Sequence, residues 1–372
     1  MREYALVVLV TAAVTFVLTP VVRRLSMRVG AMAAVRDRDV HAIPTPRLGG
    51  LGMYAGVLAG LLVAKNLPVL SNVFGYDEPL ALVLAGGIIT LIGAIDDRWP
   101  LDALTKLSGQ ILAAGVMTLV GLRLAFLALP GVTGSFSLTN DVSVPLTVLL
   151  VVLLVNAVNF VDGLDGLAAG IVAIAAAAQF TFSYNLSADY NIVRAQPGAL
   201  IAAVCLGACL GFLPHNFTPA RLFMGDSGSM LLGLMLAASA VSTTGQLDIA
   251  STRSTGLSQS LPIVFPVVVV ALVLAVPFID LVLAVVRRTR AGRSPFAPDK
   301  MHLHHRLLEI GHTQRRAVLL MYAWSAIIGF GGVAVSLSSG PALPLALAAG
   351  LAIVVLLASS LPRLRAARPR GP

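Results

Sequence analysis

Residues 156–170 read NAVNFVDGLDGLAAG, and they place four regularly spaced polar side chains between two long apolar runs. Asn156, Asn159, Asp162 and Asp165 follow one another three residues apart, which keeps neighbouring members close on a helix or a tight turn. A turn that only breaks a helix would account for the glycines and for one Asp, but not for the whole regular set. We therefore expect this stretch to join two membrane helices and to carry a functional site.

The composition predicts an all-α polytopic membrane protein. Hydrophobic residues make up 57% of the 372 residues and charged residues 12%, about half the charge of a typical soluble domain. Apolar runs of about 18 residues or more recur, and each is long enough to cross a hydrocarbon core of about 30 Å. Because little besides Pro341 and Pro344 separates the last two runs, the count is ten or eleven. The eleven expected spans are 4–22, 48–65, 79–95, 104–122, 143–158, 167–183, 198–213, 228–245, 262–286, 317–338 and 341–361.

Basic residues predict the orientation of these spans. With eleven spans, 21 of the 26 Lys and Arg residues fall on one side, which the positive-inside rule makes cytoplasmic. The N-terminus is then outside and the C-terminus is cytoplasmic, ending in a basic tail over 362–372. The first span runs into Arg23 and Arg24 without a small-residue cleavage site, so it is expected to be retained. We expect residues 1–372 to form one integral-membrane domain.

The polar clusters all fall on the predicted cytoplasmic side. Asp96 and Asp97 end the third span, Asp226 precedes the eighth, and KMHLHHR at 300–306 lies between the ninth and tenth. A transporter needs polar groups near the middle of the membrane, and those stretches are almost free of charge. An enzyme acting on a lipid head group needs them at one membrane surface, so the distribution favours an enzyme.

Clustered carboxylate and amide oxygens favour a magnesium site that handles phosphates. Asp96 and Asp97 are adjacent and therefore point in different directions, so at most one is expected to face a given ligand. Asp97 could instead cap the following helix or pair with Arg98. Lys106 is one of only three lysines, against 23 arginines, which suggests a need for a compact ammonium charge against a phosphate.

Two further motifs suit anions. In MGDSGS, at 224–229, small residues let the backbone approach a ligand at a helix N-terminus, although Asp226 could simply be the N-cap. The triad His302, His304 and His305 is followed by Arg306. Without a nearby Cys, this set favours contact with a diphosphate over zinc binding.

Taken together, the motifs resemble those of the polyprenyl-phosphate N-acetylhexosamine-1-phosphate transferases. The segments that carry the resemblance are DDRWPLDALTK (96–106), NAVNFVDGLDGL (156–167), FMGDSGS (223–229) and PDKMHLHHRLL (298–308), with HAIPTPRLGG (41–50) as a fifth. The run His-Leu-His-His-Arg, in place of three consecutive histidines, is similar to the branch that acts on UDP-N-acetylglucosamine (UDP-GlcNAc) rather than the muramoyl-pentapeptide branch.

The resemblance implies a reaction and a set of roles. The phosphate of a polyprenyl phosphate (undecaprenyl or decaprenyl) attacks the β-phosphorus of UDP-GlcNAc, releases UMP and initiates a cell-envelope polysaccharide at the cytoplasmic face of a bacterial plasma membrane. Mg²⁺, with Mn²⁺ as a substitute, is expected on Asn159 and Asp226. The expected catalytic residues are Asp96, Asp97, Asp162, Asp165 and His302, and the expected substrate-binding residues are His41, Arg47, Lys106, Asn156, His304, His305 and Arg306.

A homodimer is also implied, the surrounding membrane lipid is a partner, and nucleic acid is not expected. The alternatives are a phospho-N-acetylmuramoyl-pentapeptide transferase and a non-catalytic protein that binds or flips polyprenyl phosphate.

Overall fold

The structure is a computed structural model that describes most of the chain. The described residues are 1–32, 44–128, 135–189, 191–245, 289, 313–338 and 342–360. The expected span 262–286 and the basic tail lie outside them, as do His41, His302, His304, His305 and Arg306.

The described part is almost entirely helical, as the composition predicted. Its long helices are α1 (Arg2–Val29), α2 (Gly49–Lys65), α3 (Glu78–Arg98), α4 (Ala103–Leu119), α5 (Asn140–Val161), α6 (Leu167–Ala188), α7 (Gln196–Asn216), α8 (Gly225–Thr244), α12 (Gln314–Leu337) and α13 (Ala342–Ser360). Two short 3₁₀ helices, η1 (Leu70–Gly75) and η2 (Val193–Ala195), and an antiparallel pair of strands, β1 (Phe126–Ala128) and β2 (Ser135–Ser137), lie in connections.

Ten of the eleven expected spans correspond to these helices. Seven helical segments of the described part are long and apolar enough to cross a membrane, and α2, α4 and α13 are shorter apolar helices. The agreement follows from the physics of the membrane, where a helix is the simplest way to satisfy every backbone polar group. The chain is therefore a multi-pass membrane protein.

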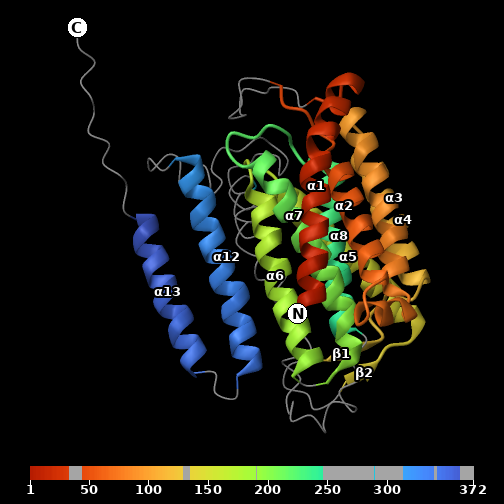
Figure 1. Cartoon of the computed structure of the whole chain (residues 1–372), viewed down its shortest axis with the longest axis vertical. Helices are drawn as coiled ribbons and strands as arrows, with labels where there is room; N and C mark the ends of the chain where they lie inside the picture. The colour runs from red at the N-terminus through yellow and green to blue at the C-terminus, as the bar shows by residue number, and fades with distance from the viewer. Residues whose placement is uncertain are drawn as a thin grey trace.

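Helix α8 forms the centre of the bundle. Its apolar window is 100% buried, whereas those of α1 and α12 are 22% and 28% buried. Helices α2, α3, α5 and α7 pack around α8, and α12 and α13 extend the bundle on the side of α6 (Figure 1). Small residues allow this close packing, since a Cβ on Gly233 of α8 would lie 2.5 Å from the Cα of Val155 in α5.

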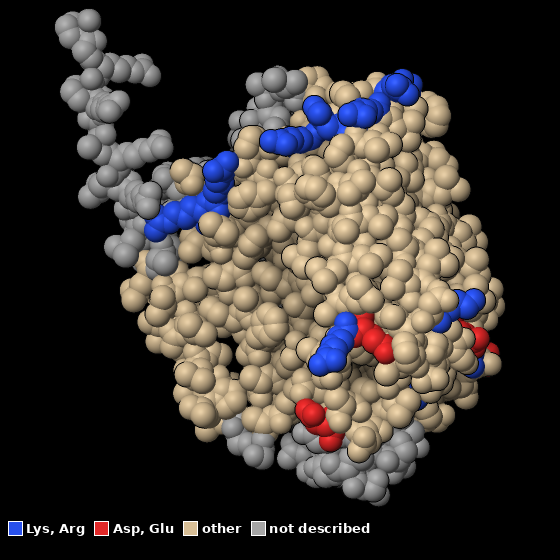
Figure 2. Space-filling model, in the orientation of Figure 1, with Lys and Arg blue, Asp and Glu red and all other residues tan. Residues whose placement is uncertain are grey.

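Successive helices α1 to α8 run in alternating directions, which gathers the polar segments at one end of the bundle. This end of the bundle lies opposite the N-terminus (Figure 1). It holds the last residues of the odd-numbered helices α1, α3, α5 and α7 and the first residues of the even-numbered helices α2, α4, α6 and α8. Lys and Arg side chains border this end, with no acidic side chain beside them in this view (Figure 2). This grouping follows the predicted charge asymmetry, and which side of the membrane this end faces stays a prediction.

Candidate active site

Asp226 lies in the first turn of α8, at a point where neighbouring helices touch the α8 backbone. A Cβ on Gly50 of α2 would lie 2.2 Å from the carbonyl carbon of Ser227, and a Cβ on Gly93 of α3 would lie 2.4 Å from the Cα of Ser227. Only residues without a side chain permit such an approach. Helices α2 and α3 therefore fix the position from which Asp226 projects.

The segment that precedes α2 runs beside the segment that precedes α8. The N–H of Phe223 donates to the carbonyl of Pro46 at 2.9 Å, which brings together two motifs far apart in the sequence. This contact places Arg47 at the polar end of the bundle, close enough to Asp162 for its charge to act on that carboxyl. The predicted substrate contact of Arg47 is untested, but its location suits one.

Asp97 caps the start of α8 from a different helix. Its Oδ1 accepts the N–H of Asp226 at 2.8 Å, and its Oδ2 accepts the N–H and the hydroxyl of Ser227 at 3.2 and 2.8 Å. Asp97 therefore caps α8, not the following helix α4, for which Asp102 is the N-cap. Only 5% of Asp97 is exposed, so these bonds form away from water.

Asp96, the neighbour of Asp97, points toward a different partner, as their adjacency predicted. Its Oδ2 lies 2.7 Å from Nζ of Lys106, and the same ammonium lies 2.7 Å from Oδ2 of Asp226. The second oxygen of Asp96 accepts the N–H of Leu101 at 2.7 Å. One lysine of α4 thus joins a carboxylate of α3 to a carboxylate of α8.

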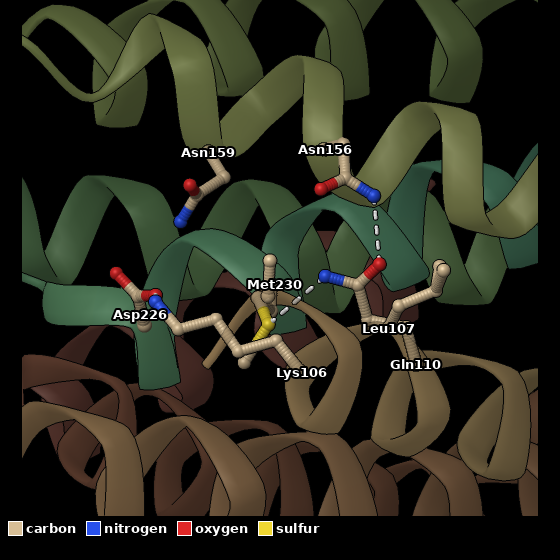
Figure 3. A pocket seen from close by; sticks show the side chains of 8 residues that line it. Lys106, Leu107, Gln110, Asn156, Asn159, Asp226 and Met230 are labelled. Atoms are coloured by element: carbon tan, nitrogen blue, oxygen red, sulfur yellow. Dashed lines mark hydrogen bonds and ion pairs between the residues drawn. The ribbon is translucent and has the colours of Figure 1, made fainter. Parts of the chain in front are cut away.

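Lys106 and Asp226 line a cavity of about 110 Å³. The lining residues are Ala103, Lys106, Leu107, Gln110, Asn156, Asn159, Asp226 and Met230, from α4, α5 and α8. Asn159 and Asp226 point toward one another across this space (Figure 3). Three motifs that are separate in the sequence therefore contribute to one cavity at the polar end of the bundle.

Two amide side chains stiffen the wall of this cavity. The Nδ2 of Asn156 donates to Oε1 of Gln110 at 2.7 Å and to the carbonyl of Val152 at 2.8 Å, and the Nε2 of Gln110 lies 3.5 Å from the sulfur of Met230 (Figure 3). Sequence reasoning predicted Asn156 but missed Gln110 and Met230. The position of Gln110 four residues after Lys106, on the same helix face, could have revealed it.

Asp165 and Asp162 do not line the cavity. Asp165 is 3% exposed, and its Oδ2 accepts the N–H of Ala220 at 3.0 Å, which ties the α5–α6 loop to the α7–α8 loop. Shielding from solvent raises the pKa of Asp162 to about 7, the charges of Asp226 and Asp97 add to the rise, and Arg47 opposes it. This placement suits support of the site better than the predicted catalytic contact with the reacting atoms.

The residues present suit Mg²⁺. Within the described ranges, no three His, Cys, Asp or Glu side chains are arranged to hold a metal ion. Magnesium, however, usually takes only one or two carboxylates and completes its shell with waters and substrate phosphates. Asp226 would supply a carboxylate oxygen, because Lys106 contacts only Oδ2 and the other oxygen points away from the ammonium (Figure 3). Asn159 now donates through Nδ2 to the hydroxyl of Ser229 at 2.9 Å, and a half-turn of its amide would exchange nitrogen for oxygen.

Comparison with known proteins shows which family the chain resembles. Residues 79–244, from α3 through α8, match the model of glycosyl transferase family 4. The decaprenyl-phosphate N-acetylglucosaminephosphotransferase of Mycolicibacterium smegmatis is 50% identical over 376 residues, covering 100% of this chain and 90% of that protein. That of Mycobacterium tuberculosis is 49% identical, covering 98% of this chain and 90% of that protein. A probable undecaprenyl-phosphate N-acetylglucosaminyl 1-phosphate transferase of Bacillus subtilis is 32% identical, with 87% and 81% covered. The chain therefore belongs to glycosyl transferase family 4, the polyprenyl-phosphate N-acetylhexosamine-1-phosphate transferases, and within it to the N-acetylglucosamine-1-phosphate branch.

Proposed function

We propose that this protein transfers N-acetylglucosamine-1-phosphate from UDP-GlcNAc to a polyprenyl phosphate in the membrane. An oxygen of the lipid phosphate forms a bond to the β-phosphorus of the nucleotide sugar. The bond from that phosphorus to the oxygen bridging the two phosphates breaks, and UMP leaves with the electron pair. The product is polyprenyl-diphospho-GlcNAc.

The observation that carries this proposal is the meeting of Lys106, Asn159 and Asp226 in one cavity at one end of a membrane bundle. An enzyme that joins a lipid head group to a soluble nucleotide sugar needs its polar groups at such an end, near the membrane surface. One ammonium, one carboxylate and one amide suit a diphosphate with a divalent cation. The names of the most similar relatives agree with this chemistry, and those at 49–50% identity favour decaprenyl phosphate as the acceptor.

The protein side of the reaction is mainly positioning and charge neutralisation. A phosphate monoester has a second pKa of about 6, so the lipid phosphate is mostly dianionic at neutral pH and needs little help from a base. Lys106 offers a cation to the substrate phosphates and is held in place by Asp96 and Asp226. Asn159 and Asp226 would hold Mg²⁺, which when bound supplies positive charge to the diphosphate. Packing of α4, α5 and α8 fixes these groups relative to one another.

The cellular setting follows from the same reasoning. Lys and Arg border the polar end without acidic side chains beside them in the view of Figure 2, and the sequence assigns 21 of the 26 basic residues to one side, so we propose that this end lies at the cytoplasmic face of a bacterial plasma membrane. The product would initiate a cell-envelope polysaccharide.

The test is release of UMP by purified protein in detergent with Mg²⁺. Reactions with polyprenyl phosphate receive UDP-GlcNAc or UDP-N-acetylmuramoyl-pentapeptide, and parallel reactions omit the lipid or add a chelator. We expect release that requires UDP-GlcNAc, lipid and the divalent cation together. Release only from the muramoyl substrate would replace the proposed donor, and binding of lipid with no release from either would indicate a binding or flipping protein.

A further inference from the structure

We propose that Asp97 is a positioning residue that holds the first turn of α8, so that Asp226 faces the cavity, and that Asp97 itself touches neither substrate. This inference rests on the proposed function and divides the Asp96–Asp97 pair, both members of which were expected to be catalytic. It also separates two roles at Asp226, whose backbone is held by Asp97 while its side chain serves the site.

The hydrogen bonds of Asp97 carry the argument. Both of its oxygens are engaged by the start of α8, one by the N–H of Asp226 and the other by two donors of Ser227. The first N–H groups of a helix have no partner within the helix, so an acceptor from outside stabilises that end. A buried carboxylate with three donors already bound has little capacity left for a lipid phosphate, which would also repel it.

The backbone packs closely around this contact. Gly225 has a φ of 69°, and a Cβ built there would lie 2.2 Å from Oδ2 of Asp97. The close approach of Gly93 to Ser227 presses α3 against the same turn. The Asp97 carboxylate is therefore enclosed between α3 and α8, and it does not line the cavity.

The consequence for function is indirect but specific. Loss of this cap would let the first turn of α8 loosen, and the carboxylate of Asp226 would lose its fixed position opposite Asn159 (Figure 3). Removal of a group that orients a metal ligand typically costs 10–100-fold in metal affinity or activity. Replacing a residue that bound or deprotonated the lipid phosphate would instead change the KM for polyprenyl phosphate and the shape of the pH–rate profile.

The test compares Asp97→Asn with the wild-type full-length protein. We expect the Mg²⁺ concentration for half-maximal UMP release to rise about tenfold or more. At saturating Mg²⁺, we expect an unchanged KM for polyprenyl phosphate and an unchanged shape of the pH–rate profile. A loss of kcat that Mg²⁺ does not restore, together with loss of the ascending limb of that profile, would overturn the proposal.

A second measurement needs neither turnover nor substrate. Hydrogen exchange of peptides spanning 222–232 should become faster in Asp97→Asn, because the amide keeps only one acceptor oxygen for the N–H groups of Asp226 and Ser227 and turns an NH2 donor toward the other. Unchanged exchange there would overturn the positioning role. If the wild type released no UMP from any nucleotide sugar, the proposed function would fail, while this exchange result would still decide whether Asp97 caps α8.

Two further variants keep the test decisive if Asp97→Asn does not fold. Ser227→Ala removes only the hydroxyl donor to Asp97, and we expect a smaller rise in the Mg²⁺ requirement. Asp102→Asn is the matched control, because Asp102 caps α4 from an exposed position and lies outside the cavity lining. If the Mg²⁺ requirement rose equally in Ser227→Ala and Asp102→Asn, or did not rise in Ser227→Ala, the specific role of Asp97 would be contradicted.

Discussion

Replacing Lys106 with Met should lower both the Mg²⁺ requirement and the turnover number. The ammonium of Lys106 lies 2.7 Å from Oδ2 of Asp226, so it shares with Mg²⁺ the carboxylate that we assign to the metal. Met has a similar length and no charge, so Lys106→Met frees Asp226 for the cation. The substrate diphosphate, however, loses a positive partner. We therefore expect a lower Mg²⁺ requirement and slower turnover.

The size of both effects follows from the exposure of the pair. Hydrogen bonds to charged groups contribute about 1.5–3 kcal/mol, and 30% exposure of Lys106 with 21% of Asp226 favours the lower end of that range. Since each 1.4 kcal/mol is a factor of ten, the Mg²⁺ concentration for half-maximal rate should fall about tenfold. The same estimate predicts that kcat falls about tenfold or more.

The assay is UMP release across a Mg²⁺ titration at constant ionic strength. Lys106→Arg is the companion variant, because a planar guanidinium keeps the charge but does not fit between two carboxylates as a compact ammonium does. We expect Lys106→Arg to lose turnover without the fall in Mg²⁺ requirement. A higher Mg²⁺ requirement in Lys106→Met, or full turnover without the ammonium, would refute the reasoning.

Three further predictions concern the neighbourhood of α8. Asp226→Asn should abolish Mg²⁺-dependent UMP release while the protein still elutes as a monodisperse species, and normal turnover by this variant would remove the metal assignment. Gly93→Ala places a Cβ 2.4 Å from Ser227 and should lower the free energy of unfolding by about 1–3 kcal/mol in a thermal melt, whereas Gly115→Ala, where nothing lies within 4 Å, should not. Because the folded-state pKa of Asp162 is raised from 3.8 to about 7, folding takes up a proton between these values and stability falls as pH rises through them. In the presence of EDTA, Asp162→Asn should therefore gain more in Tm over the wild type at pH 8 than at pH 5, and an equal gain at both would contradict this pKa.

The helices were predictable because the membrane leaves few alternatives. An apolar run of sufficient length has to be helical, so α1 through α8, α12 and α13 could be read directly from the sequence. Helix ends were less predictable, since α1 continues to Val29, well past the expected end at residue 22. Arg23, Arg24 and Arg28 stop the hydrophobic run without stopping the backbone, because long basic side chains can reach the membrane surface from a continuing helix.

The sequence was enough to predict several residues of the site but not the contacts between them. Charged and amide residues in an apolar chain are conspicuous, which identified Lys106, Asn159 and Asp226 without coordinates. Gln110 was missed because its spacing from Lys106 is only a weak signal, and the sequence does not show its partner on α5. The cap from Asp97 to α8 joins residues 129 and 130 positions apart, and no local pattern encodes such a contact.

Because of these contacts, replacing each residue should change the Mg²⁺ dependence of UMP release in a different way. The Mg²⁺ dependence therefore separates roles that a loss of activity alone would not distinguish. If Asp226 is a ligand, its removal abolishes the Mg²⁺-dependent release of UMP. If Lys106 competes for that ligand, its removal lowers the Mg²⁺ requirement, and if Asp97 holds the ligand in place, its removal raises the requirement. At one intermediate Mg²⁺ concentration all three variants would be slower than the wild type, and a single rate measurement there would call each of them catalytic. The sign of the shift in Mg²⁺ requirement distinguishes a ligand, a competitor and an anchor, because the three act on the same carboxylate from different sides.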